Sequence, residues 1–403
     1  MNVRSANTFW LESQRASTPK SYPAPNRAIT CDVLIVGGGI TGALVAYELV
    51  RAGIDTVLID KRTLGKGSTA ASTALIQYEI DVPLHQLIDQ IGERDAVLAY
   101  KLCLDAIYKL DDIVSELDSQ CGFNRKQSLY VANQPADVDM LRQEFEARAR
   151  HGFAVQWLNQ GDIRRQFAFD APGGILSADA AELDAMDLTQ ALYRYLVGKG
   201  LRIYEQTTTE NIDYGLKRVK VKTNRDTHIY ARKLVYATGY ETQQMFAQDD
   251  VLRLKSTYAL VTEPILNLPD GLKRALIWDT ADPYFYARTA QDNRMMLGGE
   301  DEWIVDAAER DALIPQKRDK LLAKFNELFP DLHAEQHLTW AGTFAETKDG
   351  LPYIGEHGRY PHSYFALGFG GNGITFSITA AAIIRSLFQT GRSEPATVFR
   401  FGR

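Results

Sequence analysis

The sequence predicts an α/β fold (α+β overall) with two domains, and three observations lead to this prediction. A strand, a glycine turn, a helix and a second strand follow one another near the start within about 30 residues, the size of one β-α-β unit. Residues 253–300 instead read as short strands joined by turns, which indicates an antiparallel sheet. The chain has 403 residues, 45% of them hydrophobic, which is enough for two cores.

The elements follow in chain order. Residues 1–28 are polar and predict an arm, pinned by the apolar side chains of Phe9, Trp10 and Leu11. The apolar run 32–36 is typical of a strand buried on both faces, residues 43–51 have helical spacing, and 56–60 are a second buried strand. Further helices are predicted over most of 86–150 and over 187–197, with strands over 128–132, 202–212, 219–223 and 234–239.

The second half of the chain changes character. Strands are predicted over 258–262, 284–288 and 294–298, followed by a helix over 314–329 that ends at Pro330. The last part, 340–389, returns to turn, strand and helix. No internal repeat is visible.

Composition excludes several functional classes. A net charge of −6 argues against a nucleic-acid partner, because phosphate binding needs a basic face. Three cysteines without a C-x-x-C pair indicate reduced thiols and a cytoplasmic location, and seven histidines without H-x-x-H spacing predict no metal site. The polar start lacks the apolar core of a signal peptide, and the longest apolar stretch, 374–388, is too short and too polar for a membrane span.

A G-x-G-x-x-G motif lies between the first strand and its helix. Gly37 permits the tight turn, Gly39 lets a pyrophosphate approach the backbone, and Gly42 lets helix and strand pack closely. The helix start also favours anionic phosphates. Asp60 ends the second strand about 20 residues further on, where an acid binds ribose hydroxyls and disfavours a 2′-phosphate. The motif in this context predicts a dinucleotide site.

Two further segments extend this site. Residues 65–73 follow the second strand and are rich in small and hydroxyl side chains, which can approach and bond a ligand. Residues 368–375 form a glycine-rich turn between a strand and a helix. The start of that second helix would face the pyrimidine edge of a flavin and stabilise negative charge on the reduced ring.

These motifs resemble the superfamily of glycine oxidase, sarcosine oxidase and D-amino-acid oxidase (the DAO superfamily). The matching segments are VLIVGGGITG at 33–42, LIDKRTLGKGSTAAS at 58–72, YATGY at 236–240, WAGTFAETKDGLPYIG at 340–355 and ALGFGGNGITFS at 366–377. The resemblance implies a Rossmann-like FAD-binding domain of the glutathione-reductase type, interleaved with a substrate domain on an antiparallel sheet. It assigns 29–88, 151–248 and 339–403 to the FAD domain and 89–150 and 249–338 to the substrate domain.

The resemblance also implies the chemistry and the cofactor contacts. Hydride would pass from a C–H next to nitrogen or oxygen to flavin N5, with no obligatory metal or nucleophile. Thr209 would contact adenine through its backbone. With the motif residues, the expected FAD contacts are Gly37, Gly39, Ile40, Thr41, Gly42, Asp60, Lys61, Gly67, Ser68, Thr69, Ser72, Thr73, Thr209, Ala237, Thr238, Gly239, Gly370, Gly371, Asn372, Gly373, Ile374 and Thr375.

The departures from the family indicate the substrate class. Glycine oxidases place arginines for the substrate carboxylate at positions that match Phe344 and Gly371 here, so an α-amino acid held in that way is not expected. Gamma-glutamylputrescine oxidases share the long arm ending in an Ile-Thr-Cys-Asp sequence, matched by 29–32, and an apolar residue at Phe344. A small amine without an adjacent carboxylate is therefore the leading substrate, and its imine product would be hydrolysed.

The resemblance leaves the electron acceptor open. Relatives with covalent flavin use a histidine where this chain has Ala71, or a cysteine near 346–347, where none exists, so FAD is expected to bind non-covalently. The lysine with which some sarcosine oxidases activate oxygen aligns near Met296. Dioxygen or another acceptor could reoxidise the flavin.

Candidate substrate-pocket residues are Tyr258, Tyr284, Phe344 and Gln77, with Glu79 as an anchor for a cationic substrate. An aromatic wall can hold an ammonium by cation–π attraction, but the tyrosines could equally pack the sheet and Glu79 could be solvated. Arg288 fits a structural salt bridge at least as well as a substrate contact. Two alternatives stay open: an FAD-dependent 2-hydroxy-acid dehydrogenase, and a flavin-binding subunit that acts only within an electron-transfer complex.

Overall fold

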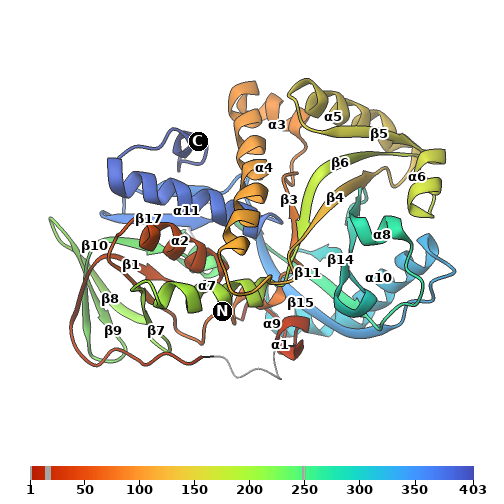
Figure 1. Cartoon of the computed structure of the whole chain (residues 1–403). Helices are drawn as coiled ribbons and strands as arrows, with labels where there is room; N and C mark the ends of the chain where they lie inside the picture. The colour runs from red at the N-terminus through yellow and green to blue at the C-terminus, as the bar shows by residue number, and fades with distance from the viewer. Residues whose placement is uncertain (1, 14–19, 247–248, 250) are drawn as a thin grey trace.

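The computed structural model describes residues 2–13, 20–246, 249 and 251–403, and they form two sheets with helices packed around them (Figure 1). The predicted α/β architecture is confirmed. Part of the predicted arm over 1–28 lies outside the described residues.

The first sheet has a parallel centre. Its main path is β16 (Tyr353–Glu356), β17 (Ser363–Leu367), β10 (His228–Tyr236), β1 (Ile29–Val36), β2 (Thr56–Ile59) and β7 (Arg202–Tyr204). The hairpin of β8 (Thr209–Tyr214) and β9 (Val219–Thr223) joins through β9, which runs antiparallel to β10. Val33, Leu34 and Ile35 of β1 are fully buried, because the strand has neighbours on both edges and cover on both faces.

Three helices cover one face of this sheet. They are α2 (Ile40–Arg51), α7 (Ala185–Val197) and α11 (Gly373–Thr390), and α2 packs against the other two (Figure 1). Val33 and Ile35 point into the core that these helices form, whereas Leu34 belongs to the core on the opposite face. This alternation along β1 follows from the period of two in a strand.

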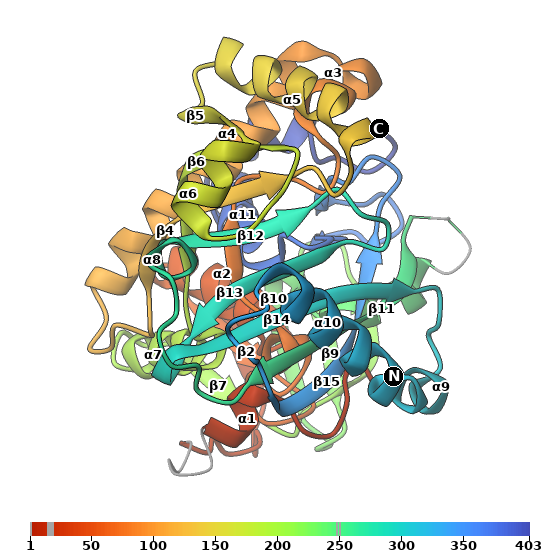
Figure 2. The same ribbon diagram turned by 90° about the vertical axis from the view of Figure 1, so that its right-hand side faces the viewer.

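The second sheet is antiparallel except where β12 runs parallel to β4. Its path is β15 (Gln336–Glu346), β11 (Arg253–Thr262), β14 (Arg294–Glu302), β13 (Phe285–Ala290), β12 (Ala275–Asp279), β4 (Asn124–Val131), β6 (Gly173–Glu182) and β3 (Leu75–Gln77), with β5 (Val155–Asn159) on β6. Helix α10 (Ile314–Leu328) packs across β11, β14 and β15 (Figure 2).

Further helices surround the second sheet. Around β4, β5 and β6 lie α4 (Glu93–Ser115), α5 (Val138–Arg150) and α6 (Gln160–Phe167), while α3 (Leu84–Ile91) packs on α4 and α5. Two others, α8 (Asp270–Arg274) and α9 (Ala307–Ala312), complete the set near β12 and β15. Within the described part of the chain, every helix is too short or too polar to cross a bilayer.

Two sequence predictions differ from the observed elements. The strand predicted over 202–212 is interrupted between β7 and β8, where Gln206 has a φ of +49° and the Glu205 carboxylate accepts hydrogen bonds from two backbone N–H groups instead of continuing a ladder. The predicted domain boundaries also do not coincide with the division between the sheets. Strands β3, β5 and β6 lie in the second sheet, although 29–88 and 151–248 were assigned to the FAD domain.

The N-terminal segment is fastened to the second sheet. Arg4 forms a β-bridge with Gly342, and Ser5 exchanges hydrogen bonds with the backbone of Ala341. The short helix α1 (Phe9–Ser13) buries Phe9 and Trp10, and the Trp10 indole donates to the Ser72 carbonyl at 2.6 Å. These contacts bring the start of the chain beside the predicted cofactor site.

Candidate active site

A cavity of about 800 Å³ is lined by residues from both sheets. Its wall includes the turn after β1, the end of β2, the turns after β10 and β17, and residues of β11, β12 and β15. Of the predicted FAD contacts, Gly42 and Thr375 lie outside the wall and all the others line it. Val3 also lines the cavity, so the N-terminal segment reaches this site.

The glycines of the first motif are needed for close backbone packing. Gly37 has a φ of +113°, and a Cβ there would meet the Ala237 carbonyl oxygen at 2.3 Å. A Cβ on Gly42 would lie 1.9 Å from the Gly37 carbonyl oxygen, so Gly42 lets α2 pack against the turn and does not face the cavity. The turn therefore has the geometry that a pyrophosphate-binding loop requires.

Two helix N-termini open on the same cavity. Gly39 precedes α2 and Asn372 precedes α11, and neither of these two residues caps its helix with its own side chain. Both capping residues line the cavity. The positive ends of two helix dipoles therefore face one space, which favours phosphate at one end and negative charge on a reduced ring at the other.

Asp60 organises the turn as well as facing the cavity. Its Oδ2 accepts from the Gly38 N–H and its Oδ1 from the Arg62 N–H, both at 2.6 Å. Burial raises the pKa of this carboxyl, and these two N–H donors oppose the rise. Each carboxylate oxygen keeps a further lone pair for a ribose hydroxyl. Lys61 and Arg62 both pair with Glu241 across the turn.

The segment after β2 is held by hydrogen bonds to its backbone and hydroxyls. The indoles of Trp10 and Trp340 donate to the carbonyls of Ser72 and Ala71, at 2.6 and 2.9 Å. The Thr69 hydroxyl accepts from the N–H of Ile40, the first residue of α2. This segment is thus fixed against the start of α2, where small side chains leave room for a ligand.

Gln77, the last residue of β3, and Glu79 and Asp81, which follow it, all line the cavity. Asn372 donates through its side-chain amide to the carbonyls of Gln77 and Glu79, at 3.3 and 2.7 Å. The Thr375 hydroxyl, placed outside the wall, donates to the same Gln77 carbonyl at 3.1 Å. The start of α11 therefore positions this polar segment rather than leaving Asn372 and Thr375 free for the cofactor.

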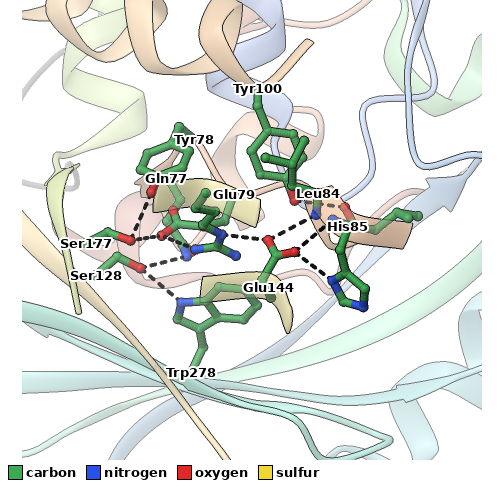
Figure 3. Close-up of polar contacts among 12 residues, drawn as sticks. Gln77, Tyr78, Glu79, Leu84, His85, Tyr100, Ser128, Glu144, Ser177 and Trp278 are labelled. Atoms are coloured by element: carbon green, nitrogen blue, oxygen red, sulfur yellow. Dashed lines mark hydrogen bonds and ion pairs between the residues drawn. The ribbon is translucent and has the colours of Figure 1, made fainter. Parts of the chain in front are cut away.

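Glu79 belongs to a buried ionic network (Figure 3). It is 4% exposed, and its Oε1 accepts from Ser177 at 2.7 Å and from Arg148 at 3.2 Å. Arg148 also binds Glu144 at 2.6 Å, and Glu144 accepts from His85. Burial opposes ionisation of Glu144, but Arg148 and the N–H groups of His85 and Leu84 outweigh it and lower its pKa to about 2. The expectation that Glu79 could be solvated is wrong.

A second acidic cluster lines the cavity, and the sequence analysis does not single it out. It comprises Asp81, Asp301 and Glu346, and Lys255 pairs with Glu346 at 2.6 Å. The pKa of Asp301 is raised to about 7, mainly by burial and also by nearby Glu346 and Asp81, while Thr257 and Lys255 oppose the rise. Desolvation likewise raises the pKa of Asp81 to about 6, and Asp81 is one of the residues that line the cavity.

The signal for this cluster was present in the sequence. Residues 298–302 read Gly-Gly-Glu-Asp-Glu directly after an apolar strand, and Asp81 follows two residues after Glu79. Acids at the end of a buried strand, next to a ligand-binding segment, could have been grouped with Glu79. What the sequence did not provide was the register that brings Asp301 near Asp81 and Glu346.

Aromatic rings form much of the remaining wall. Tyr284 and Tyr286 stack with their centroids 5.9 Å apart, and Tyr130 and Trp278 stack at 3.7 Å. Phe344 also lines the cavity and is 8% exposed. Burial raises the pKa of Tyr284 and of Tyr286 well above the usual value, so both phenols are neutral at physiological pH. An acidic end with aromatic walls suits a cation better than an anion.

Tyr258 was predicted to line the pocket, but the structure places it elsewhere. It is fully buried in the core beneath α10, its hydroxyl donates to the Arg310 carbonyl, and Lys317 lies over its ring. Its neighbours Thr257 and Ala259 line the cavity. Because side chains alternate along β11, Tyr258 must point to the opposite face of the sheet.

Arg288 is a structural residue. It is 2% exposed and donates to the carbonyls of Thr73, Leu183 and Thr289, with Glu182 3.7 Å away. It lies outside the cavity wall. Among the arginines of the described chain, Arg62 lines the cavity, and it lies beside Asp60 at the nucleotide end.

Comparison with known families decides the class of this protein. The family model described as DAO, FAD dependent oxidoreductase, matches residues 32–387. The chain belongs to the DAO family of FAD-dependent oxidoreductases. The predicted family, cofactor and enzyme class are confirmed.

Individual members of the DAO family are similar over much of the chain. Glycine oxidase of Geobacillus kaustophilus is 24% identical over 91% of this chain and 94% of its own length. A crystal structure of glycine oxidase from the same organism superposes with a TM-score of 0.74, at 21% sequence identity, over 91% of this chain and 96% of that chain. Gamma-glutamylputrescine oxidoreductase of Escherichia coli is 24% identical over 95% of this chain and 89% of its own length. A Bacillus subtilis protein named for a Rieske 2Fe-2S centre is 30% identical over 66% of this chain, which spans about half (51%) of that relative.

The residues present fit the FAD of the DAO family. The wall of one cavity includes Thr209, Asp60, the start of α2 and the start of α11, where the family's FAD contacts were expected. The close approaches at Gly37 and Gly42 shape the turn, and the N-termini of α2 and α11 would supply N–H donors for phosphate and ring oxygens. When bound, FAD supplies the two-electron acceptor that oxidation of a C–H bond requires.

Proposed function

We propose that this DAO-family enzyme oxidises the C–N bond of a small amine that carries no carboxylate next to its nitrogen. The observation that carries this proposal is the charge of the cavity beyond the nucleotide site. Six carboxyl groups line the wall away from Asp60 and Glu241 at the nucleotide end: Glu79, Asp81, Asp279, Asp282, Asp301 and Glu346. Lys255 of the wall is paired with Glu346, and Glu79 is paired with Arg148 behind the wall.

The arrangement disfavours an α-amino acid or a hydroxy acid. A substrate carboxylate is usually bound by an arginine that donates two parallel hydrogen bonds. Phe344 occupies one predicted arginine position, Gly371 the other, and Arg288 is held by carbonyl groups behind the wall. An anionic substrate would therefore meet carboxylates without a matching cation, which costs binding energy at short range. The 2-hydroxy-acid alternative has no observation in its favour.

The same groups suit an amine. An ammonium donates three hydrogen bonds and carries the charge that carboxylates require. Tyr284, Tyr286 and Phe344 offer apolar faces to its carbon chain and π-faces to its charge. Asp301 has its pKa raised to about 7 by burial, so near neutral pH it can take a proton from the bound ammonium at a carboxylate oxygen. That step leaves the neutral amine from which hydride can depart.

The overall reaction balances in two stages. The neutral amine loses hydride from the carbon next to nitrogen, two electrons and a hydrogen go to the bound FAD, and an iminium ion remains. Water then adds to that carbon and releases a carbonyl compound and ammonium. The relatives named for glycine and for gamma-glutamylputrescine act on C–N bonds by their names, which supports this reaction class.

Product analysis tests the proposal. The holoenzyme is incubated with butylamine and an artificial two-electron acceptor, and aldehyde and ammonia are measured against acceptor reduced. We expect the three to form in equal amounts, while 2-aminobutyrate and 2-hydroxybutyrate yield no carbonyl product. Carbonyl formation from either acid with none from any amine would contradict the proposal. Flavin that no compound of these classes reduces would favour an electron-transfer subunit instead.

A further inference from the structure

Residues 66–73, the cofactor segment, include several expected FAD contacts, and all of them except Lys66 and Ala70 line the cavity. Four carbonyl groups of this segment accept hydrogen bonds from side chains that are distant in sequence: Lys66 from Arg4 at 3.1 Å, Ala71 from Trp340 at 2.9 Å, Ser72 from Trp10 at 2.6 Å and Thr73 from Arg288 at 2.5 Å. Strands β15 and β13 supply Trp340 and Arg288. Arg4 and Trp10 precede the first strand of the nucleotide-binding unit, so the start of the chain helps to hold the cofactor segment.

The N-terminal segment, residues 2–13, is anchored on β15, the edge strand of the second sheet. The N–H of Thr343 donates to the Val3 carbonyl at 2.9 Å. The N–H of Ser5 donates to the Ala341 carbonyl at 2.9 Å as well. The segment therefore adds a short antiparallel piece to this edge and pairs with its backbone N–H and C=O groups. Pairing of this kind fixes the side to which each side chain points.

Helix α1 packs on the cofactor segment itself. Phe9 and Trp10 share an apolar cluster with Ala70 of that segment. Trp10 is 2% exposed, and its indole N–H is committed to the Ser72 carbonyl. A donor removed from a buried hydrogen bond costs more than one removed from a bond that water can replace. Trp10 is therefore the stronger of the two N-terminal contacts, because the hydrogen bond of Arg4 is exposed.

The N-terminal segment also forms part of the cavity wall. Val3, Gly342 of β15 and Ala71 of the cofactor segment all line the cavity. A Cβ on Gly342 would lie 3.3 Å from the Ala71 Cβ, so β15 and the cofactor segment approach closely at this point. The contacts that fix the start of the chain thus lie where β15 and the cofactor segment meet in the wall.

We propose that the N-terminal segment is a component of the FAD site, in which Trp10 and Arg4 are positioning residues that hold the cofactor segment in its FAD-binding conformation. Both side chains lie outside the described cavity wall, so each acts through the carbonyl group that it binds. The apparent Kd of a ligand rises when only a fraction of the protein has the binding conformation. Donors that order the segment before FAD arrives therefore lower the Kd for FAD. This inference concerns the cofactor and does not depend on which substrate the enzyme oxidises.

Trp10→Phe tests the stronger contact. The variant keeps an aromatic ring in the apolar cluster and removes the N–H donor. FAD is titrated into the apoprotein, and binding is followed by flavin fluorescence. We expect the Kd for FAD to rise about tenfold, because one buried hydrogen bond no longer favours the binding conformation.

Trp157→Phe is the matched control. It makes the same replacement on β5, where the indole N–H has no hydrogen-bond partner among the described residues. Both variants lose an indole, but only Trp10→Phe loses a donor to the cofactor segment. We expect Trp157→Phe to leave the Kd for FAD within about twofold of the wild-type value.

Arg4→Met is an independent second variant. It keeps a long side chain and removes the donor to the Lys66 carbonyl. Because that hydrogen bond is exposed, the variant should fold as the wild type does. We expect the Kd for FAD to rise about threefold, which is less than for Trp10→Phe.

Hydrogen exchange separates positioning from a general loss of stability. The N–H groups of Ala70 and Ser72 donate to carbonyls within the cofactor segment, so their exchange reports its order. We expect exchange in this segment to be about tenfold faster in Trp10→Phe apoprotein than in wild-type apoprotein, and the difference to vanish when FAD is saturating. A merely structural role for Trp10 would also speed exchange in β15 and would leave the difference in place with FAD bound.

Several results would overturn the inference. One is an unchanged Kd for FAD in both Trp10→Phe and Arg4→Met, and another is an equal rise in Trp157→Phe. Where Trp10→Phe does not fold, Arg4→Met and the wild-type apoprotein decide. Exchange of residues 66–73 in wild-type apoprotein as fast as in an unfolded chain would show that the segment is not ordered before FAD binds, which also overturns the inference. Because every readout follows FAD binding, failure of the proposed amine oxidation would leave these results interpretable.

Discussion

The side-chain amide of Asn372 donates to the backbone carbonyl of Glu79 at 2.7 Å. This hydrogen bond joins the start of α11, which faces the flavin end of the cavity, to the segment that carries Glu79 and Asp81. The Gly371 N–H makes a second link, because it donates to Asp81 at 3.0 Å. The positive end of one helix and the acidic wall are therefore parts of one rigid unit.

Replacing Asn372 by Asp should uncouple this unit. A carboxylate cannot donate to the carbonyls of Gln77 and Glu79, so the Glu79 carbonyl would lose this donor while the Gln77 carbonyl keeps only the Thr375 hydroxyl. We expect the free energy of unfolding to fall by about 1–3 kcal/mol. The added negative charge at the start of α11 should also weaken FAD binding. Urea unfolding and flavin titration of the apoprotein measure the two effects, and unchanged values for both would refute the link.

Asp301 should give the amine reaction a pH dependence near neutrality. Its raised pKa, about 7, means that the carboxylate loses its charge as the pH falls through this value. We therefore expect kcat/KM for an amine to fall between pH 8 and pH 6 by more than ionisation of the free amine alone requires. Asp301→Asn should lower kcat/KM at pH 8 and remove this inflection. A variant whose profile keeps the inflection would assign it to another group.

Phe344 should control the sign of charge that the pocket accepts. Phe344→Arg would bring a cation beside Lys255 and Glu346 and repel an ammonium, so KM for an amine should rise about tenfold. Phe344→Leu keeps an apolar side chain and should change KM by less than about threefold. Steady-state assays with both variants decide this. Similar KM values in the two variants would show that charge at this position has no role.

FAD should be released when the protein is unfolded. The described cavity wall contains neither histidine nor cysteine, and the cysteines Cys31, Cys103 and Cys121 are all buried elsewhere. Acid precipitation should therefore leave the yellow colour in the supernatant and a colourless pellet. A pellet that keeps its flavin absorbance after washing would reveal a covalent bond to another side chain.

The nucleotide half of the site could be predicted from the sequence because its signals are local. Glycine spacing, a strand before it and Asp60 after it all lie within one short β-α-β unit. Even there, Gly42, Asn372 and Thr375 were predicted as FAD contacts, and the structure shows that they make packing contacts or hydrogen bonds within the protein. Motif spacing alone does not distinguish such a role from contact with a ligand.

The substrate half depends on long-range register and was predicted less well. Tyr258 was predicted to line the pocket, although it points to the core while Thr257 and Ala259 line the cavity. Asp301 was missed because a bulge in the pairing of β11 with β14, between Ser256 and Tyr258, sets which residues of the two strands lie opposite each other. Glu79 was recognised as a candidate anchor, but its partner Arg148 lies 69 residues away in the chain.

Anaerobic flavin reduction tests the central claim most directly. The purified holoenzyme is mixed with amines, α-amino acids and 2-hydroxy acids of matched carbon skeleton, and the visible flavin band is recorded without oxygen. The acidic, aromatic wall predicts that amines bleach the band and that neither acid does so at the same concentration. Bleaching by an amino acid or a hydroxy acid, with no response to any amine, would contradict this account of the cavity.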